Sequence, residues 1–427
     1  MAAGCPLLTE LVFAAALACC ASAAVLLLAD LYLIAVHLGK ADREIARERA
    51  ALRTLQPESD ATSSVCVQLP VFNETQVAAA IDSLCDLVWP HGRLEILVLD
   101  DSTDETRDIA AARIALWQSR GVDIRHYPRT HRRDYKAGAL ADAFGQTSAQ
   151  YIAIFDVDYR PERDFLVKLM PPLLARPRAA FVQARLDYRN RDRNLLTRAQ
   201  AMGLDAYFAF EQAGRAWAGI PAPFNGTGAV WRRAAIEDAG GWRGDSLLED
   251  LDLSLRAFAK GWVAINLVTV AVVGELPETA ATLVSQRRRW ALGTGQSSRA
   301  LSRRLMRHLG LGRAVVFTLL SLQHASLAIL LLAGLAAALA TRLADPDRGS
   351  AALAAFAASL AIVVGLKSAG AALAHRALGG AFRWAFFADL AAMWLMEAAL
   401  LPIRAKALMQ GLVDSRPEPF VRTPKKG

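Results

Sequence analysis

Two long apolar blocks constrain most strongly what this chain can fold into. Leu11–Leu38 is almost purely apolar, and a second block runs from Ala314 to Ile403. A helix needs about 20 apolar residues to cross the hydrocarbon layer of a membrane. The region between the blocks, roughly 60–300, has the composition of an ordinary globular domain. The chain is therefore expected to consist of an N-terminal transmembrane anchor (1–40), a globular domain and a C-terminal membrane block (314–403).

The residues around the first apolar block indicate how it is oriented. The block is longer than the core of a signal peptide, which has about 7–15 residues, and no Lys or Arg precedes it. We therefore expect an anchor that is not cleaved. Positive charge marks the cytoplasmic flank of a membrane helix. Lys40 and four arginines follow the block (Arg43, Arg47, Arg49, Arg53), which predicts a cytoplasmic globular domain after a basic juxtamembrane linker at 41–60.

The C-terminal block contains two clear candidate spans and one ambiguous stretch. Ala314–Ala340 and Ser350–Ala374 are each long enough to cross a membrane. Trp384–Ile403 is also apolar, but it contains Asp389 and Glu397, and basic residues lie beyond both of its ends. This stretch either re-enters the membrane, lies along its surface or crosses it against the charge rule. The number of spans stays open at this point.

The net charge of +8 gathers near the membrane ends and in the triple arginine at 287–289. Contact with anionic membrane lipid is the favoured interpretation of this charge, and no nucleic-acid partner is expected. The cysteines show no metal-ligand spacing, so the sequence predicts neither a zinc site nor a disulfide framework. They are Cys5, Cys19, Cys20, Cys66 and Cys85.

Short apolar runs rich in β-branched residues alternate with helical patterns between the two blocks. The expected strands are Val65–Leu69, Leu94–Leu99, Val122–His126, Tyr151–Phe155 and Ala179–Ala184. The expected helices are Thr75–Leu87, Thr103–Arg120, Lys136–Phe144 and Asp164–Leu174. This alternation predicts βαβ units and an α/β fold with a mainly parallel sheet. Ligands of such sheets bind at the carboxyl ends of the strands.

Polar residues follow three of the expected strands, at 70–74, 100–104 and 156–158. Asp156 and Asp158 are two residues apart, so their carboxylates share one face if the extended backbone continues beyond Phe155. Paired carboxylates suit a hard divalent cation, here Mg²⁺ or Mn²⁺. The structural alternatives are a turn capped by these aspartates and, at 100–104, a helix N-cap at Ser102 or Thr103.

A series of short motifs, taken in order, resembles the membrane-embedded family 2 glycosyltransferases, which include cellulose synthase. The resemblance is strongest to the glucomannan (β-mannan) synthase branch, and it covers roughly 65–300 together with the tail FVRTPKKG (420–427), which resembles a gating loop. The motifs are QLPVFNE (68–74), LDDSTDET (99–106), DYKAGAL (134–140), FDVD (155–158), FNGTGAVWRR (224–233), LLEDLDLSLR (247–256) and QRRRW (286–290).

The resemblance implies a domain layout and a role for each motif. It implies a GT-A-type, Rossmann-like catalytic domain at 61–285, interfacial helices with the QxxRW motif at 286–313, and a C-terminal tail at 404–427. It implies nucleotide-sugar binding by Pro70, Asn73, Glu74, Asp100, Asp101, Lys136, Asp156, Gln286 and Arg289. It implies acceptor binding by Trp290, Glu249 and Gly226, metal binding by Asp156 and Asp158, and a catalytic base at Asp250.

Each of these roles has a structural alternative. Asp252 competes with Asp250 as the base, and all three acidic residues at 249–252 would also complement a helix dipole. Lys136 would suit a diphosphate at a helix N-terminus, or it is a surface lysine. Trp290 and its neighbouring arginines are also the residue types that anchor a helix at a membrane surface.

The sequence therefore predicts an integral-membrane, inverting β-hexosyltransferase in an inner or Golgi-type membrane. Its donor would be UDP-glucose or GDP-mannose, and its acceptor a growing β-glycan of the cellulose or glucomannan kind. One alternative is the transfer of a single hexose to a lipid, as in ceramide or diacylglycerol glucosyltransferases. Another is a non-catalytic subunit that binds nucleotide or takes part in transport. The single N-terminal anchor and the lack of an extension resembling a cyclic-dinucleotide-binding domain argue against regulation of the cellulose synthase kind.

Overall fold

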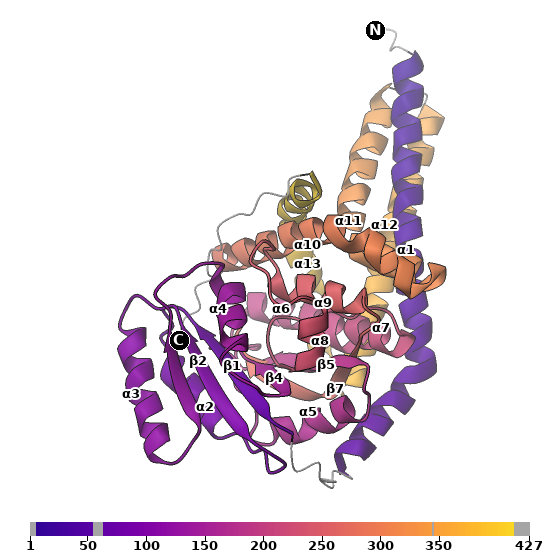
Figure 1. Ribbon diagram of the computed structural model, residues 1–427. Helices are drawn as coiled ribbons and strands as arrows, with labels where there is room; N and C mark the ends of the chain where they lie inside the picture. The colour runs from indigo at the N-terminus through magenta and orange to yellow at the C-terminus, as the bar shows by residue number, and fades with distance from the viewer. Residues whose placement is uncertain (1–5, 54–62, 344–345, 414–427) are drawn as a thin grey trace.

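A computed structural model describes residues 6–53, 63–343 and 346–413 of the 427-residue chain. A globular domain surrounds one β-sheet, and long helices extend from one side of it (Figure 1). The C-terminal tail, with its predicted gating-loop motif at 420–427, lies outside the described residues.

The central sheet has seven strands in the order β3-β2-β1-β4-β6-β5-β7. Strands β1 to β4 pair in parallel, β5 and β7 pair in parallel, and β6 runs antiparallel to both of its neighbours. The predicted α/β fold with a mainly parallel sheet is confirmed. The strands are β1 (Val65–Val71), β2 (Leu94–Asp100), β3 (Ile124–Pro128), β4 (Tyr151–Ile154), β5 (Ala179–Tyr188), β6 (Ala229–Arg232) and β7 (Val263–Gly274).

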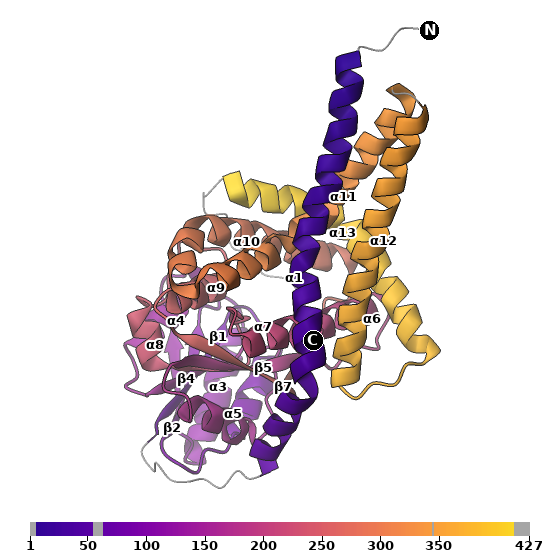
Figure 2. The same ribbon diagram turned by 90° about the vertical axis from the view of Figure 1, so that its right-hand side faces the viewer.

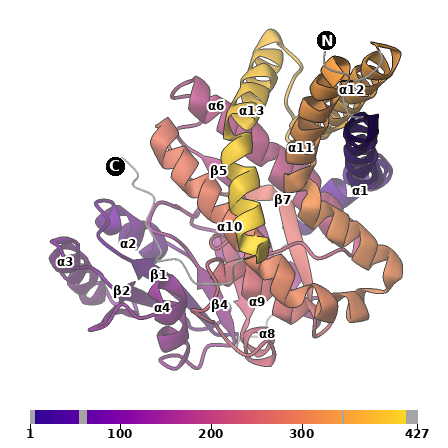
Figure 3. The same ribbon diagram turned by 90° about the horizontal axis from the view of Figure 1, so that it is seen from above.

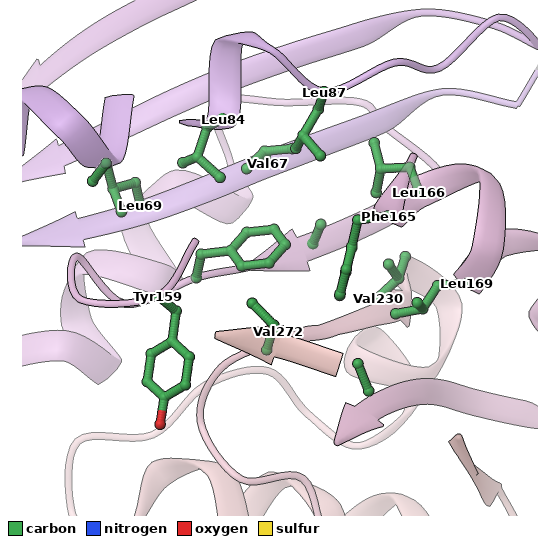
Figure 4. Packing of buried hydrophobic residues seen from close by; sticks show 14 of the residues in the cluster. Val67, Leu69, Leu84, Leu87, Tyr159, Phe165, Leu166, Leu169, Val230 and Val272 are labelled. Atoms are coloured by element: carbon green, nitrogen blue, oxygen red, sulfur yellow. The ribbon is translucent and has the colours of Figure 1, made fainter. Parts of the chain in front are cut away.

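Helices cover both faces of the sheet because alternate strand residues point to opposite sides. Val65, Val67 and Leu69 of β1 are buried in one apolar cluster, together with residues of three helices: α2 (Val77–Cys85), α3 (Thr106–Ser119) and α5 (Phe165–Leu174). Figure 4 shows part of this cluster, where Phe165 and Leu169 of α5 lie near Val230 and Val272 of the sheet. Cys66 instead faces the second cluster, with α4 (Tyr135–Phe144), α8 (Arg233–Asp238) and α9 (Glu249–Phe258).

One continuous helical segment joins the sheet to the long helices. Helix α6 (Leu195–Asp205) begins at Asn194, whose side chain accepts a hydrogen bond from the Thr197 backbone N–H at 2.9 Å. It continues into the π-helix η1 (Ala206–Gln212) and then into α7 (Ala213–Ala218).

The long helices are α1 (Pro6–Arg53), α10 (Ala280–Leu309), α11 (Leu311–Leu343), α12 (Pro346–Ala377) and α13 (Trp384–Val413). Helices α1, α11 and α12 pack side by side and extend beyond the globular domain (Figure 2). Among the described residues, three helices are long and apolar enough to cross a membrane: Glu10–Arg53, Asp347–Ala377 and Trp384–Val413. The predicted span Ala314–Ala340 lies within α11.

The basic segment that follows the first apolar block is helical as far as Arg53. Residues 41–53 continue α1 without a break and pack on the globular domain. The Glu48 carboxylate accepts hydrogen bonds from the backbone N–H groups of Val268 (3.1 Å) and Thr269 (2.7 Å). Those groups lie where the register between β5 and β7 shifts. The Arg- and Glu-rich segment consists of good helix formers, so it extends the helix instead of interrupting it.

Helix α13 resolves the ambiguous stretch into one long helix with Pro402 inside it. It crosses over α10 and is inclined to α1 and α12 (Figures 2 and 3). Its two acidic residues both have basic partners. Asp389 pairs with Arg198 of α6 at 2.7 Å, and Glu397 pairs with Arg404 further along the same helix.

Candidate active site

A cavity of about 540 Å³ extends from the carboxyl ends of β1, β2 and β4 to helices α12 and α13. Most of the predicted site residues line this cavity, although they come from separate parts of the chain. They are Pro70, Glu74, Asp101, Lys136, Asp156, Asp158, Gly226, Glu249, Asp250, Gln286, Arg289 and Trp290. Acidic and basic side chains therefore share one wall, as a site for a diphosphate and a cation would require.

Two of the predicted nucleotide-binding residues, Asp100 and Asn73, are not part of the cavity wall. Asp100 is fully buried and holds the loop after β2, because it accepts hydrogen bonds from the Ser102 backbone N–H and from His126, both at 2.8 Å. Burial raises the pKa of Asp100, but these hydrogen bonds outweigh it and leave the pKa below its usual value. Asn73 accepts a hydrogen bond from the Thr103 backbone N–H at 2.9 Å. Both residues thus shape the rim of the site.

The two aspartates of FDVD lie in a turn after β4 and not in extended backbone. Strand β4 ends at Ile154, and the Tyr159 backbone N–H bonds to the Asp156 carbonyl at 3.0 Å, which closes a turn. The backbone beyond Phe155 is therefore a turn, one of the two conformations that the sequence left open. The turn nevertheless leaves Asp156 and Asp158 on the same cavity wall. The hydroxyl of Thr227 fixes the turn by accepting a hydrogen bond from the Asp156 backbone N–H at 3.0 Å.

Lys136 lies in the first turn of α4 and connects two of the acidic groups. Its ammonium is 2.5 Å from an Asp156 oxygen, 2.8 Å from the Gly226 carbonyl and 3.7 Å from a Glu249 oxygen. Burial alone lowers the pKa of Lys136, but the carboxylates of Asp156 and Glu249 outweigh burial and raise it. Lys136 is therefore a half-buried cation held between the acidic groups of the cavity wall, and not a surface lysine.

Gly226 adopts a backbone conformation that brings the chain close to the acidic groups. Its φ angle is +79°, in the left-handed region that favours glycine. A Cβ atom at this position would lie 3.1 Å from an Asp250 oxygen and 3.5 Å from the Lys136 ammonium. A side chain here would intrude between the two charged groups.

Asp250 and Asp252, both in the first turn of α9, have different surroundings. Burial and the neighbouring Glu249 raise the pKa of Asp250 to about 7, despite the opposing effect of Lys136. Asp252 instead forms an ion pair with Arg256 at 2.6 Å and does not line the cavity. Of the two candidate bases, Asp250 is the one that lines the cavity, and its pKa suits proton transfer near neutral pH.

Helix α10 supplies Gln286, Arg289 and Trp290 to the cavity wall. It packs directly on α9, where Gly293 leaves room for Leu248. Burial lowers the pKa of Arg289, although Glu249, Asp250 and Asp156 partly oppose this effect. Arg289 and the three carboxylates that influence it all line the cavity.

The sequence reasoning missed the contribution of η1. Tyr207, Phe208, Phe210 and Glu211 of this π-helix line the cavity, and the Tyr207 hydroxyl donates a hydrogen bond to Asn225 at 3.0 Å. Short π-helices occur frequently at functional sites. The only signal in the sequence is the aromatic run AYFAFEQ, which also suits an ordinary buried helix.

The family model described as glycosyl transferase family group 2 matches residues 151–366, half of the chain. The chain belongs to this family. The resemblance predicted from the ordered motifs is thus confirmed. The match spans the FDVD turn, the acidic start of α9 and the QRRRW segment.

Curated relatives of this family 2 glycosyltransferase are of the glucomannan type. Glucomannan 4-β-mannosyltransferase 9 of Arabidopsis thaliana is 41% identical over 247 residues, which cover 57% of this chain and 46% of the relative. The probable glucomannan 4-β-mannosyltransferase 11 of Oryza sativa subsp. japonica is 42% identical over 234 residues, which cover 54% of this chain and 41% of the relative. The chain spans about half the length of the curated relatives it matches.

A solved structure shares the overall fold. It is the mannosyltransferase of Pyrobaculum calidifontis in complex with GDP-Man and Mn²⁺, with a TM-score of 0.56 and 22% sequence identity. The alignment covers 90% of this chain and 99% of that chain. The likeness includes long helices as well as the GT-A-like domain.

Proposed function

We propose that this chain is an inverting β-hexosyltransferase that uses a nucleotide-sugar donor and an acceptor at the membrane. One observation carries the proposal: Asp156, Asp158, Lys136, Asp250 and Arg289 all line one cavity at the carboxyl end of a mainly parallel sheet. Group transfer from a diphosphate needs cationic stabilisation of the leaving group and a base on the attacking hydroxyl. Both kinds of group are present within this cavity.

The donor would lie across the cavity with its diphosphate near Lys136 and Arg289. Its nucleoside would extend toward Pro70, Glu74 and Asp101 at the ends of β1 and β2. We favour GDP-mannose over UDP-glucose because the curated relatives are named mannosyltransferases and the structural relative was solved with GDP-Man. The product would then be a β-1,4-linked mannan or glucomannan.

The carboxylates of Asp156 and Asp158 fit a hard divalent cation, since both line the cavity and offer only oxygen ligands. The described residues contain no group of three or more Asp, Glu, His or Cys side chains arranged to hold a metal. The donor diphosphate and water would complete the ligand set, as is common for Mg²⁺. When bound, Mg²⁺ or Mn²⁺ supplies positive charge that stabilises the departing diphosphate.

Asp250 would accept the proton of the attacking acceptor hydroxyl. The hydroxyl oxygen bonds to the anomeric carbon from the side opposite the diphosphate, and the bond between that carbon and the diphosphate breaks. Its electron pair leaves with the nucleoside diphosphate, and the configuration inverts. A pKa of about 7 leaves a useful fraction of Asp250 ionised at neutral pH while keeping it basic enough to take the proton.

The same proposal places the globular domain on the cytoplasmic side of an inner or Golgi-type membrane. Three helices of membrane-crossing length and the basic residues at the end of the first apolar block support this orientation. The nucleotide sugar would then be reached from the cytoplasm, and membrane lipid would surround α1, α11 and α12.

The test is a transfer assay with the purified full chain in detergent, Mn²⁺, mannotetraose and either radiolabelled GDP-mannose or UDP-glucose. We expect GDP-mannose to label an oligosaccharide that an endo-β-1,4-mannanase digests. Transfer in the Asp250→Asn variant should fall by about 100-fold or more, while donor binding persists. Donor binding without turnover in the wild type would instead support a non-catalytic subunit. Transfer by the variant at the wild-type rate would remove Asp250 as the base.

A further inference from the structure

The cavity continues past the catalytic groups into a second part, which we call the membrane arm. Its walls come from α10, α12 and α13, and its defining residues are Arg287, Lys367, Met393, Trp394, Leu401 and Arg404. Helices α12 and α13 are both long and apolar enough to cross a membrane. The membrane arm therefore combines apolar side chains of membrane-type helices with basic groups.

Arg287 and Arg289 of α10 lie toward different ends of the cavity. Residues two positions apart on a helix are separated by about 200° around its axis. Arg289 interacts with Glu249, Asp250 and Asp156, which surround the catalytic end. Arg287 interacts instead with Glu397 and Arg404 of α13. The donor diphosphate is thus expected near Arg289, and Arg287 is left for another ligand.

The positive charge of Arg287 is poorly compensated within the described residues. Its guanidinium carbon lies 4.8 Å from the centre of the Trp290 ring, and its Nε atom is buried without a hydrogen-bond partner. The nearby Glu397 carboxylate is already engaged by Arg404. Burial lowers the pKa of Arg287, which reflects the cost of holding a charge there.

The other two cations of the membrane arm have acidic partners. Lys367 of α12 pairs with Asp30 of α1 at 3.2 Å, and Arg404 pairs with Glu397. Because Lys367 and Arg404 are each paired with a carboxylate, the positive charge of Arg287 is in excess among the described residues of the membrane arm. A half-buried guanidinium of this kind is well suited to a phosphate, which it can bind through two parallel hydrogen bonds.

We propose that the membrane arm binds an amphiphilic acceptor that carries a phosphate group, and that Arg287 recognises this phosphate beside Trp290. The apolar part of the acceptor would lie against Met393, Trp394 and Leu401. This inference rests on the proposed transferase function and adds, for the same site, a class of acceptor besides the growing β-glycan. It assigns Arg287, which lies between the residues of the QxxRW motif, a role in the choice of acceptor.

The test compares binding of farnesyl phosphate and farnesol to the full chain in detergent. The two probes share one apolar chain and differ only in the phosphate. We expect farnesyl phosphate to bind the wild type about 10- to 100-fold more tightly than the Arg287→Gln variant, which corresponds to the loss of a charged hydrogen bond. Farnesol should bind both proteins weakly and equally. Arg287→Lys, which keeps the charge, should recover part of the affinity.

The matched control is Arg288→Gln, which removes the same charge one residue away, outside the cavity wall. It should bind farnesyl phosphate as the wild type does. Equal affinity of the Arg287→Gln and Arg288→Gln variants for farnesyl phosphate would overturn the inference. So would inorganic phosphate competing as strongly as farnesyl phosphate, because the recognised anion would then come from solution.

Donor binding separates this inference from the proposed function. The Arg287→Gln variant should bind GDP-mannose as the wild type does, and a tenfold loss of donor affinity instead would assign Arg287 to the donor and contradict the inference. If the wild type transfers no sugar to any acceptor, the transferase proposal fails. The phosphate-dependent difference in probe binding is measured independently of that outcome.

Discussion

The raised pKa of Asp250 predicts opposite effects of pH on turnover and on folding stability. As the proposed base, Asp250 would have to be ionised to accept a proton, so kcat/KM should rise with pH and level off above about pH 7. The folded chain holds this proton more tightly than an unfolded chain, whose carboxyl has a pKa near 3.8. The resulting stability is therefore complete at low pH and is lost as the pH rises through about 7.

The Asp250→Asn variant checks both parts of this prediction. Its residual activity should lose the rise near pH 7, and its thermal midpoint should exceed that of the wild type at pH 8 but not at pH 4. Thermal unfolding at the two pH values and a pH–rate profile provide the measurements. A wild-type profile that is flat between pH 5.5 and 8.5 would contradict the assigned pKa.

A substitution at Gly226 tests whether a side chain there obstructs the cavity, apart from the backbone strain that it causes. The Gly226→Ala change forces a side chain into the left-handed region, at a cost of about 1–2 kcal/mol. Its Cβ would also lie 3.1 Å from Asp250, so we expect transfer to fall by at least tenfold. Gly121 is the matched control, because its φ is +84° and a Cβ there would meet no atom within 4 Å. Gly121→Ala should lose similar stability and keep full activity.

At the scale of secondary-structure elements, the sequence predicts the first half of the sheet better than the second. Strands β1 to β5 are short, apolar and rich in β-branched residues, and helical patterns separate them, so their positions follow from periodicity. Strand β6 has only four residues, and it pairs antiparallel with both of its neighbours although the helices at 195–218 precede it, so the parallel βαβ pattern does not predict it. The conformation of η1 depends on a shift in backbone hydrogen bonding that no residue type specifies.

The site was predictable as a set of residues but not as a geometry. The ordered motifs identified most of the groups that line the cavity through their joint resemblance to a family, whereas each group alone also had a structural explanation. The FDVD turn was predictable only as an alternative to extended backbone, since the pattern of Tyr151–Phe155 does not show where the strand ends. The inward burial of Asp100 was equally hidden, because it depends on contacts with His126 and Ser102.

The C-terminal end of α1 packs on the edge strand β7, and we expect this contact to contribute to the stability of the fold. Glu48 satisfies two backbone N–H groups and the Thr269 hydroxyl where the β5–β7 register shifts. Glu48→Ala should lower the free energy of unfolding by about 1–3 kcal/mol and speed hydrogen exchange at Val268 and Thr269. Glu44→Ala is the control, since Glu44 pairs with the exposed Arg47 of the same helix and should contribute less than about 1 kcal/mol.

For the whole molecule, α1 connects the long apolar helices and the globular domain into one unit. Its N-terminal half packs on α11 and α12, and its C-terminal half contacts α7 and β7. Between these contacts, Asp30 pairs with Lys367 of α12, and both side chains line the cavity. The position of the membrane arm relative to Asp250 therefore depends on how α1 is held at both ends. These contacts join segments that are distant in the sequence, so patterns within single segments do not predict them.

The Asp30–Lys367 pair predicts an asymmetry between single and double substitutions. The Asp30 side chain is only 6% exposed, so Lys367→Met leaves a buried carboxylate without this cation and should cost roughly 3–5 kcal/mol. The double variant Asp30→Asn, Lys367→Met removes both charges and should recover most of that loss. Arg376→Met breaks the exposed pair with Asp42 between the same two helices and should cost less than about 1 kcal/mol. Unfolding in detergent measures all three, and equal losses in Lys367→Met and Arg376→Met would show that the buried pair does not join α1 to α12.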